Sequence, residues 1–334
     1  MIDVLKPGLL STVQDRGRHG QQYVGVVPGG AMDTVAMEIA NGLVGNRAGE
    51  AALEITVLGP DLIFDSEALI AVCGGRFDAT VDGHPLPWDR PVLLPRTARL
   101  RFRQSTLGSR AYLAVAGGIV TPPVLGSRST YLPAKFGGYY GRALVAGDRL
   151  PLLRDVAELS RLRYRQLKHR KEVNGLRSVG WSAPALTLPE REPVVVHALE
   201  GRHHELFDAA SRRAFFEATW KVSPESNRMG FRFVGPVLSR EQPGDLLSEP
   251  ACRGTVQVPA GGAPIALMAD HQSTGGYPKI AEVAGADVPR LAQLPPGGTV
   301  QFARCTLEQA RELRRVLRHR IDTSLRALSW SYAA

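Results

Sequence analysis

The chain of 334 residues has little cysteine and lacks any long apolar segment. Its three cysteines lie far apart, match no metal-ligand spacing and, being odd in number, cannot all pair in disulfides. No apolar run approaches the roughly 20 residues of a membrane-spanning helix. The first residues, Met1 to Leu5, follow a strand pattern without the basic region of a secretory leader. We therefore expect a protein of the reducing cytoplasm.

Several catalytic signatures are also missing. The sequence has no G-x-x-x-x-G-K-[ST] loop for ATP, no G-x-S-x-G nucleophile elbow, and no H-E-x-x-H or C-x-x-C pattern for a metal. No Ala-Met-Lys-Met-like hairpin is present to carry covalent biotin. We therefore predict no metal site and no biotin on this chain, and expect any chemistry to lie outside these motif classes.

The net charge of +9 comes from two segments. Residues 154–177 carry a net +5 and residues 304–326 a net +4, so the rest of the chain is neutral. A nucleic-acid-binding protein would interleave basic residues with aromatics on a folded face. Because the charge here falls in a linker-like segment and a C-terminal helix, we expect no nucleic acid, and a solvated face or an acidic partner instead.

The pattern of the first part of the chain predicts a mainly β protein. Strand-like runs at 62–64, 68–72, 79–81, 91–94, 99–103 and 110–115 are separated by Gly, Pro and Asp turns. Such spacing favours a closed or nearly closed barrel. One helix interrupts them, with Asp33 as its N-cap and Gly45 at its C-terminal end.

The later part repeats this arrangement. Residues 153–190 are Arg-rich and then Pro-rich, as in a linker. Strands return afterwards, with a helical insert around 205–218, and a last helix begins at a capping box of Thr306 and Gln309. We predict a first subdomain at 1–152, a linker at 153–190, a second subdomain at 191–305, and a C-terminal helix and tail at 306–334.

Two polar, glycine-rich segments are the best candidates for a site. One is residues 269–278, between strand-like runs, and the other is residues 12–21. Further polar residues stand beside glycines at 28–33, 54–56 and 226–232. Paired glycines let backbone approach a ligand, although a long hairpin loop would also have this composition. The number of such segments favours a composite site.

Single residues within these segments leave alternatives open. Asp15 with Arg16 and Arg18 forms a carboxylate held by guanidinium groups, an anion site of two arginines, or a turn salt bridge. Arg228 has the chemistry to clamp a carboxylate. A base formed by Asp270 with its neighbour His271 is disfavoured, because adjacent side chains diverge in extended backbone.

Two lysines and one glutamate also fit either a structural or a functional role. Lys135 and Lys279, two of only six lysines, lie near paired Gly and Tyr, although each fits an ordinary exposed lysine as well. Glu54 lies in a strand, where it is either outward-facing or functional.

A set of motifs occurs in order along residues 2–305. They are Leu10-Ser-Thr-Val-Gln-Asp-Arg-Gly-Arg18, Gly30-Ala-Met-Asp33, Asn41-x-Leu-Val-Gly-Asn46, Ala51-Ala-Leu-Glu-Ile55, Ala111-Tyr-Leu-Ala-Val-Ala-Gly-Gly-Ile119, Leu125-Gly-Ser-Arg-Ser-Thr130, Arg228-Met-Gly230, Gln257-Val-Pro259 and Thr274-Gly-Gly-Tyr-Pro278. In these the chain resembles the biotin-dependent carboxyltransferase-like family, which includes the C subunit of 5-oxoprolinase, the so-called allophanate hydrolase subunit 2 and a sporulation kinase-inhibitor antagonist.

The resemblance implies two tandem cyclophilin-like β-barrel subdomains with a few capping helices. It also implies an enzyme subunit, weak or inactive alone, that works with a B subunit of related fold and an A subunit. The implied reaction converts 5-oxo-L-proline, ATP and water into L-glutamate, ADP and phosphate. A five-membered lactam is a poor electrophile, so coupling to ATP supplies activation and driving force. The location of the ATP site is not assigned.

Carrying the motifs over residue by residue gives a set of expected site residues. The catalytic candidates are Asp15, Arg228 and Asp270. The expected substrate-binding residues are Gln14, Arg16, Asp33, Gln257, Gln272, Thr274, Gly275, Gly276 and Tyr277. Asn227 and Phe231 replace an acid and a tyrosine that are usual in the family, which argues against a base at position 227.

Two alternatives stay open at this point. The chain is either a carboxyltransferase component of a biotin-dependent urea or amide carboxylase, or a regulatory protein that binds a kinase-inhibitor-like B subunit without turnover. Allophanate hydrolysis is disfavoured, because it needs an activated nucleophile and no amidase-like Lys-Ser-Ser arrangement is visible.

Overall fold

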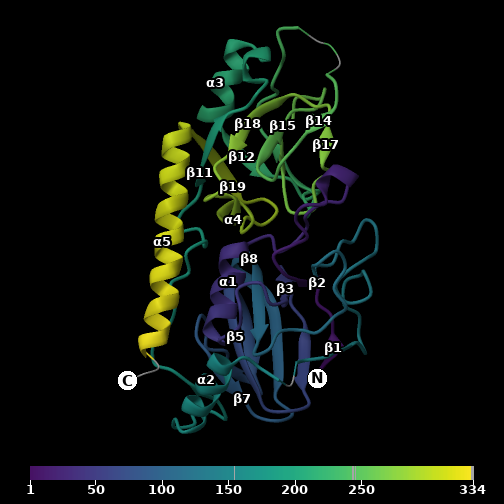
Figure 1. Ribbon diagram of the computed structural model, residues 1–334. Helices are drawn as coiled ribbons and strands as arrows, with labels where there is room; N and C mark the ends of the chain where they lie inside the picture. The colour runs from purple at the N-terminus through teal and green to yellow at the C-terminus, as the bar shows by residue number, and fades with distance from the viewer. Residues whose placement is uncertain (154, 243, 245, 332–334) are drawn as a thin grey trace. The chain divides into compact units, whose positions relative to one another are not determined.

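The computed structural model describes residues 1–153, 155–242, 244 and 246–331, with the side chains of 328–331 excluded. Arg154 of the basic segment and the last three residues, 332–334, of the predicted C-terminal helix and tail lie outside the described residues. The chain divides into two units (Figure 1). The first gathers residues 1–18, 33–188 and 320 onward, and the second gathers residues 19–32 and 189–319.

The first unit is built on a sheet that has ten strands within the described residues, in the order β10-β7-β5-β8-β4-β1-β9. Strand β2 extends it by pairing with β3, which pairs with β8, and β6 pairs with β5. The strands are β1 (Ile2–Lys6), β2 (Leu10–Gln14), β3 (Ala52–Thr56), β4 (Asp61–Phe64), β5 (Ala68–Val81), β6 (His84–Pro85), β7 (Val92–Leu94), β8 (Arg99–Val115), β9 (Arg149–Leu150) and β10 (Arg177–Ser178).

Two strands of this sheet are much longer than the sequence pattern suggests. Strand β5 has 14 residues and β8 has 17, and they pair with each other. The expectation of separate strands at 68–72 and 79–81, and at 99–103 and 110–115, is therefore wrong. The register between β5 and β8 shifts three times between Gly74 and Ala79. The glycines that suggested turns lie instead at bulges, where a strand bends without ending.

Helix α1 (Thr34–Leu43) packs against β5 and β8. Asp33 caps it as predicted, because its carboxylate accepts hydrogen bonds from the N–H groups of Val35 and Ala36. Gly45, with φ of 77°, follows the helix in the left-handed conformation. A Cβ on Gly45 would lie 2.6 Å from the backbone nitrogen of Ser160 in α2 (Glu158–Lys168). The glycine thus lets α2 approach the end of α1 closely.

The second unit is a closed barrel of seven strands among the described residues, in the order β11-β18-β15-β16-β13-β12-β19. Strands β11 and β19 close it by pairing in parallel, and the other pairs are antiparallel. The strands are β11 (Val194–Glu200), β12 (Thr219–Val222), β13 (Gly230–Val234), β15 (Thr255–Gln257), β16 (Ile265–Leu267), β18 (Lys279–Val283) and β19 (Thr299–Arg304). Strands β14 (Glu249–Pro250) and β17 (Thr274–Gly275) pair with each other in a separate two-stranded sheet.

Aromatic side chains fill the core of the second unit. Phe215 and Phe302 stack with ring centroids 4.6 Å apart, beside fully buried Trp220. The helices of this unit are η1 (Gln22–Val24), η2 (His204–Leu206), α3 (Ala209–Glu217) and α4 (Val288–Leu291). Met32 is fully buried in this core, so residues 19–32 belong to the second unit although they precede most of the first in sequence.

Helix α5 (Leu307–Ser331) begins at the predicted capping box. The Thr306 N–H donates to Gln309 Oε1 at 2.8 Å, and the Gln309 N–H donates to Thr306 Oγ1 at 3.3 Å. On this helix Leu307 and Val316 are 48% and 43% exposed, whereas Ile321 is buried. Among the helices that the structure describes, none has both the length and the apolar character to cross a membrane.

The mainly β fold with a few helices is confirmed. The predicted subdomain bounds stay a prediction. The segment 153–190 contains α2 and also β10, which pairs with β7 of the first unit.

Candidate functional site

The polar segment 269–278 connects β16 to β18, two strands that both pair with β15. In its middle, β17 pairs with β14, with Thr274 opposite Pro250 and Gly275 opposite Glu249. The segment is therefore a long loop with its own strand pairing. Two ion pairs fix it, one at each end.

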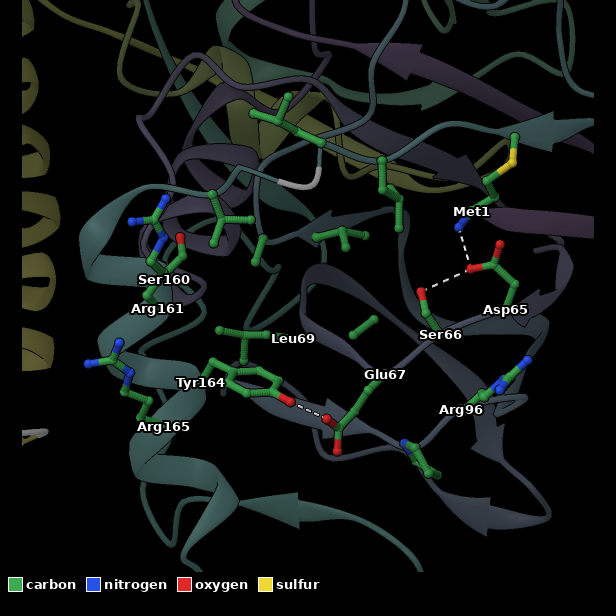
Figure 2. A pocket seen from close by; sticks show the side chains of 17 residues that line it. Met1, Asp65, Ser66, Glu67, Leu69, Arg96, Ser160, Arg161, Tyr164 and Arg165 are labelled. Atoms are coloured by element: carbon green, nitrogen blue, oxygen red, sulfur yellow. Dashed lines mark hydrogen bonds and ion pairs between the residues drawn. The ribbon is translucent and has the colours of Figure 1, made fainter.

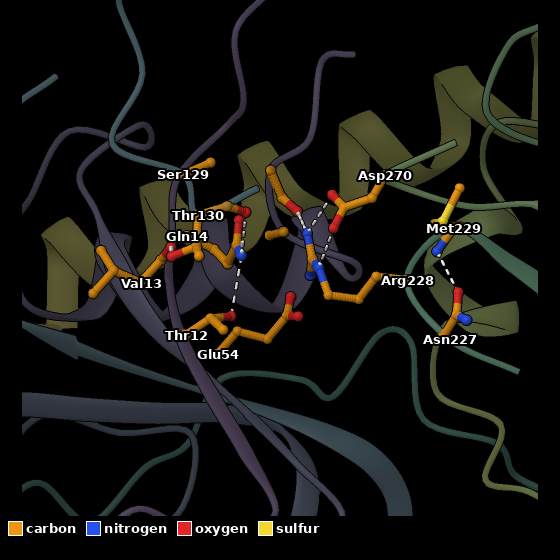
Figure 3. Close-up of polar contacts among 12 residues, drawn as sticks. Thr12, Val13, Gln14, Glu54, Ser129, Thr130, Asn227, Arg228, Met229 and Asp270 are labelled. Carbon is orange, nitrogen blue, oxygen red and sulfur yellow. Dashed lines mark hydrogen bonds and ion pairs between the residues drawn. The ribbon is translucent and has the colours of Figure 1, made fainter. Parts of the chain in front are cut away.

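The first ion pair joins Arg228 to Asp270 (Figure 3). Arg228 Nε donates to Asp270 Oδ2 at 2.9 Å, and Nη2 donates to Oδ1 at 3.0 Å. Both side chains are buried, at 4% and 1% exposed. Nη2 also donates to the Gly30 carbonyl at 2.6 Å, and the Asp270 N–H donates to the Arg228 carbonyl at 2.8 Å. This bidentate geometry fixes the guanidinium plane and the start of the loop together.

The second ion pair joins Lys279 to Glu249. Lys279 Nζ donates to Glu249 Oε1 at 2.8 Å and to the Pro250 carbonyl at 2.6 Å, and the lysine is 4% exposed. The hydrogen bond from Lys279 lowers the pKa of the Glu249 carboxyl below its usual range. Since Glu249 and Pro250 form β14, the pair fixes the strand on which β17 rests. Lys279 is thus no ordinary exposed lysine, whereas Lys135 is exposed.

Between these two anchors lies a buried amide. Gln257, at the end of β15, is 1% exposed, and its Nε2 has no hydrogen-bond partner within the described part of the chain. A Cβ on Gly275 would stand 2.9 Å from Gln257 Nε2 and 3.4 Å from Gln272 Nε2. Glycine at 275 therefore leaves both amides room to face the loop. A buried donor without a partner is costly and calls for a water or a ligand.

The far part of the loop borders a cavity of about 540 Å³. Gly276, Tyr277 and Pro278 line it, opposite apolar side chains and Arg240. Tyr277 is 50% exposed and Thr274 is also exposed. A Cβ on Gly276 would lie 2.9 Å from the Leu246 carbonyl. The volume is within the usual range of small-molecule sites.

Neither His271 nor Asn227 has the geometry of a base acting with Asp270. The Nδ1 of His271 lies 2.6 Å from the Gln272 carbonyl, and burial lowers the pKa of the ring, which is therefore neutral at pH 7. Its Nδ1 then carries the proton that bonds the carbonyl. Exposed Asn227 accepts the Met229 N–H at 2.8 Å, which shapes the turn before β13.

In the first unit, the Asp15 carboxylate is saturated by donors. Oδ1 accepts from the Gly17 N–H at 2.8 Å, from Ser127 Oγ at 2.6 Å and from Ser129 Oγ, and Oδ2 accepts from the Arg128 N–H at 2.6 Å. Asp15 is 7% exposed. The carboxylate thus ties the loop after β2 to residues 127–129, and neither the salt bridge nor the anion site considered for Asp15 describes these contacts.

Gln14 and Arg16 differ in their surroundings. Gln14 is fully buried, and its Nε2 donates to Thr12 Oγ1 at 3.0 Å and to the Thr130 carbonyl at 3.2 Å (Figure 3). Its Oε1 accepts no hydrogen bond within the described residues. Arg16 is more than half exposed and lies 3.5 Å from Glu38. Gln14 therefore offers a buried acceptor, whereas Arg16 lies at the surface.

Asp33 belongs to a buried polar chain. Besides capping α1, its Oδ2 accepts from Thr187 Oγ1, and its backbone N–H donates to the hydroxyl of Tyr112 at 2.7 Å. Tyr112 in turn donates to Glu54 Oε2 at 2.7 Å. Burial, with Glu54 and Asp33 nearby, raises the pKa of Tyr112 well above its usual value. Glu54 is 1% exposed, so the alternative that it faces outward is wrong.

The structure brings some of the predicted residues together and leaves others apart. Arg228 contacts Asp270, and Gln257 lies beside Gln272 and Gly275. Residues 127–130 bind both Gln14 and Asp15. Asp33 contacts Thr187 and Tyr112, and Arg16 lies beside Glu38.

The sequence reasoning missed two contributors in the second unit. Glu249, the partner of Lys279, is 30 residues away from it in a two-residue strand without a recognisable pattern. Arg253 donates to the carbonyls of Ala31 and Met32, more than 220 positions away. The position of Lys279 directly after the Gly-Gly-Tyr-Pro run was the only signal for its ion pair.

One group of side chains has the spacing of a metal site. Ligand atoms of Glu200, His204 and Glu205 lie within 4.8 Å of one another. However, Arg304 lies 2.6 Å from Glu200, and Arg212 pairs with Glu205. Because both carboxylates already have cationic partners, we assign this cluster to surface ion pairs.

Replacing Arg228 by Met leaves the Asp270 carboxylate buried without its partner. We expect Arg228→Met to lower the free energy of unfolding by about 3–5 kcal/mol in urea denaturation, since a lone buried charge is costly. The control is Arg232→Met on the same hairpin, whose pair with Glu225 is exposed at 3.9 Å and should contribute less than about 1 kcal/mol. Equal stability of the two variants would contradict the assigned role.

The Lys279–Glu249 pair predicts a pH-dependent difference in stability. Because the folded-state pKa of Glu249 is lowered from about 4.5, its contribution is full above that pH and is lost as the pH falls through the folded-state value. Urea midpoints should show wild type more stable than Glu249→Gln at pH 7, and the two should converge as the pH falls well below 4.5. A gap independent of pH, or the same gap for exposed Glu225→Gln, would argue against this role of the pair.

Comparisons with known proteins show the family of the chain. The family described as carboxyltransferase domain, subdomain A and B, matches residues 24–304. The chain is 40% identical to the 5-oxoprolinase C subunit of Escherichia coli strain K12 over 316 residues, which is 94% of each chain. It is 37% identical to the Haemophilus influenzae protein of the same name, again over 94% of both.

A solved structure shares the fold over nearly the whole chain. The urea amidolyase of K. lactis superposes with a TM-score of 0.85 at 33% identity over 97% of this chain. This chain spans only 20% of that much longer protein. By the family match and the full-length relatives, the chain belongs to the family of carboxyltransferase domains with subdomains A and B.

Proposed function

We propose that this chain is the C subunit of an ATP-dependent 5-oxoprolinase. The complex would convert 5-oxo-L-proline, ATP and water into L-glutamate, ADP and phosphate. The observation that carries the proposal is the 40% identity to a protein of that name over 94% of both chains. A match over nearly the whole of both chains indicates the same domain architecture.

The proposal includes partners and a place of action. A B subunit of related fold and an A subunit complete the enzyme, and this chain alone is weak or inactive. ATP is a substrate of the complex, and biotin is not carried here. The three free cysteines are compatible with a reducing cytoplasm.

Among the proposed site residues, Arg228 and Asp270 would act as one fixed pair. The bidentate contact fixes the orientation of the carboxylate, so its chemical contribution is positioning of a polar reactant at the loop. Asp15 has four donors on its carboxylate and would position the loop carrying Gln14 and Arg16 rather than take a proton.

Substrate contacts are proposed for the amide-lined part of the second unit. The unpartnered Nε2 of Gln257 is a donor for a lactam carbonyl, with Gln272, Thr274 and Tyr277 on the adjoining loop. Gly275 and Gly276 would admit the substrate where a side chain would not fit. Gln14 and Asp33 would complete the set in the first unit.

A second candidate function is the carboxyltransferase step of a biotin-dependent urea carboxylase. The structural similarity to the K. lactis urea amidolyase favours it, since the fold matches over 97% of this chain. The small share of that protein that the chain spans weakens the transfer of its activity.

The test is ADP release coupled to glutamate formation, using this chain co-expressed with the A and B subunits. We expect turnover of 5-oxoproline only with all three, and at least a tenfold loss of kcat/KM for Gln257→Leu. Gln104→Leu, on an exposed part of β8, serves as the control with unchanged kinetics.

Two outcomes would count against the proposal. A well-formed complex without turnover would favour the urea carboxylase function, in which a biotinylated carrier and urea become the next reagents. Full activity of this chain alone would contradict its role as one part of a complex.

A further inference from the structure

A second cavity, of about 1090 Å³, opens on the first unit (Figure 2). It is lined by Met1, the β4–β5 turn, the β7–β8 turn, the end of β8, residues 152, 153 and 156, and α2. None of the proposed site residues lines it. Its volume is at the upper end of small-molecule sites, which suits a segment of protein chain.

The floor of this cavity is apolar. Leu69 and Val115 line it and are almost fully buried, with Ala116 and Leu152 beside them. At its edge, Leu153 is 46% exposed and Met1 is 36% exposed. A floor of this kind offers a place for one or two apolar side chains of a ligand.

The two acids in the lining already have partners. Asp65 accepts from the amino group of Met1 and from Ser66 Oγ at 2.9 Å. Glu67 accepts from the hydroxyl of Tyr164, and Lys168 lies 3.4 Å from it. These pairs neutralise the negative charge at the cavity from within the chain.

The arginines that line the cavity differ in whether they have an acidic partner. Arg161 pairs with Asp155. The side chains of Arg96 and Arg165 make no hydrogen bond or ion pair with any residue that the structure describes, and both are exposed. Figure 2 shows Arg96 across the cavity from Arg161 and Arg165 of α2, with all three side chains extending outward from the rim.

A further polar group lines the same cavity. The Ser160 hydroxyl is fully buried and has no hydrogen-bond partner within the described residues. It stands in the first turn of α2, where a hydroxyl and the helix dipole both favour an acceptor with negative charge. The cavity thus combines an apolar floor, exposed arginines at the rim and the Ser160 hydroxyl as a donor without a partner among the described residues. These features suit a ligand that carries both a negative charge and an apolar group.

We propose that this cavity docks an acidic segment of a partner protein of the complex, with carboxylates at Arg96 and Arg165 and an apolar side chain over Leu69 and Val115. Arginine, tyrosine and methionine, all present in the lining, are among the residues enriched in protein interfaces. The inference rests on the part of the proposed function that gives this chain protein partners.

The test measures binding directly, apart from turnover. The immobilised chain is titrated with the purified A subunit and, separately, the purified B subunit of the 5-oxoprolinase by biolayer interferometry at 50 and 200 mM salt. We expect Arg96→Glu/Arg165→Glu to raise the Kd of one partner at least tenfold and to flatten its salt dependence. Thermal melting checks that the variant, altered only at exposed residues, stays folded.

The matched control is Arg170→Glu/Lys171→Glu, which makes the same change of charge outside the cavity, on the basic segment that also contains Arg165. It should leave both affinities within about twofold. Leu153→Asp, at the apolar edge, should weaken binding of the same partner as the arginine variant.

Several results would overturn the inference. These are equal losses in the control and the arginine variant, no loss in either, or no binding of either partner to wild type. Loss of binding to a single-stranded oligonucleotide, with binding of both partners intact, would also contradict it. If wild type binds a partner but the complex does not turn over 5-oxoproline, the proposed function fails. The affinities of the variants then still test whether the partner binds at this cavity.

Discussion

The buried ion pair between Arg228 and Asp270 is the contact on which the candidate site depends. It joins the hairpin before β13, the start of the loop at 270 and the carbonyl of Gly30 through one guanidinium group. Burying two charges is costly unless every donor and acceptor finds a partner. The two Asp270 oxygens and the Gly30 carbonyl accept from the Arg228 guanidinium, which offsets this cost. These contacts also fix the position at which the loop begins.

The two units hold their polar loops by the same physical means. In the second, Lys279 and Glu249 secure the far end of the loop through β14. In the first, one carboxylate, Asp15, gathers donors from residues 17 and 127–129. In each unit, buried charged groups fix the backbone of the loop. The neutral side-chain amides of Gln14 and Gln257 each keep one buried atom without a hydrogen-bond partner among the described residues.

Local chemistry made part of this structure predictable. Asp33 caps α1 and Thr306 with Gln309 caps α5, because each involves atoms within three residues of one another. Long-range pairing left no comparable local signal. The continuity of β5 and β8 depends on bulges in their pairing, and Lys279 contacts Glu249 across a separation of 30 residues. The motif residues, Arg228 and its partner Asp270 included, were therefore found, whereas Glu249, the partner of Lys279, was not.

The central claim is that the loop at 272–277, held at both ends, receives the substrate. Hydrogen–deuterium exchange of the assembled complex, with and without 5-oxoproline, tests it most directly, since binding slows exchange where backbone is covered or ordered. The account predicts slower exchange at residues 272–277, with no change at the exposed turn 224–227. Turnover of 5-oxoproline without any change in exchange at 272–277 would contradict it.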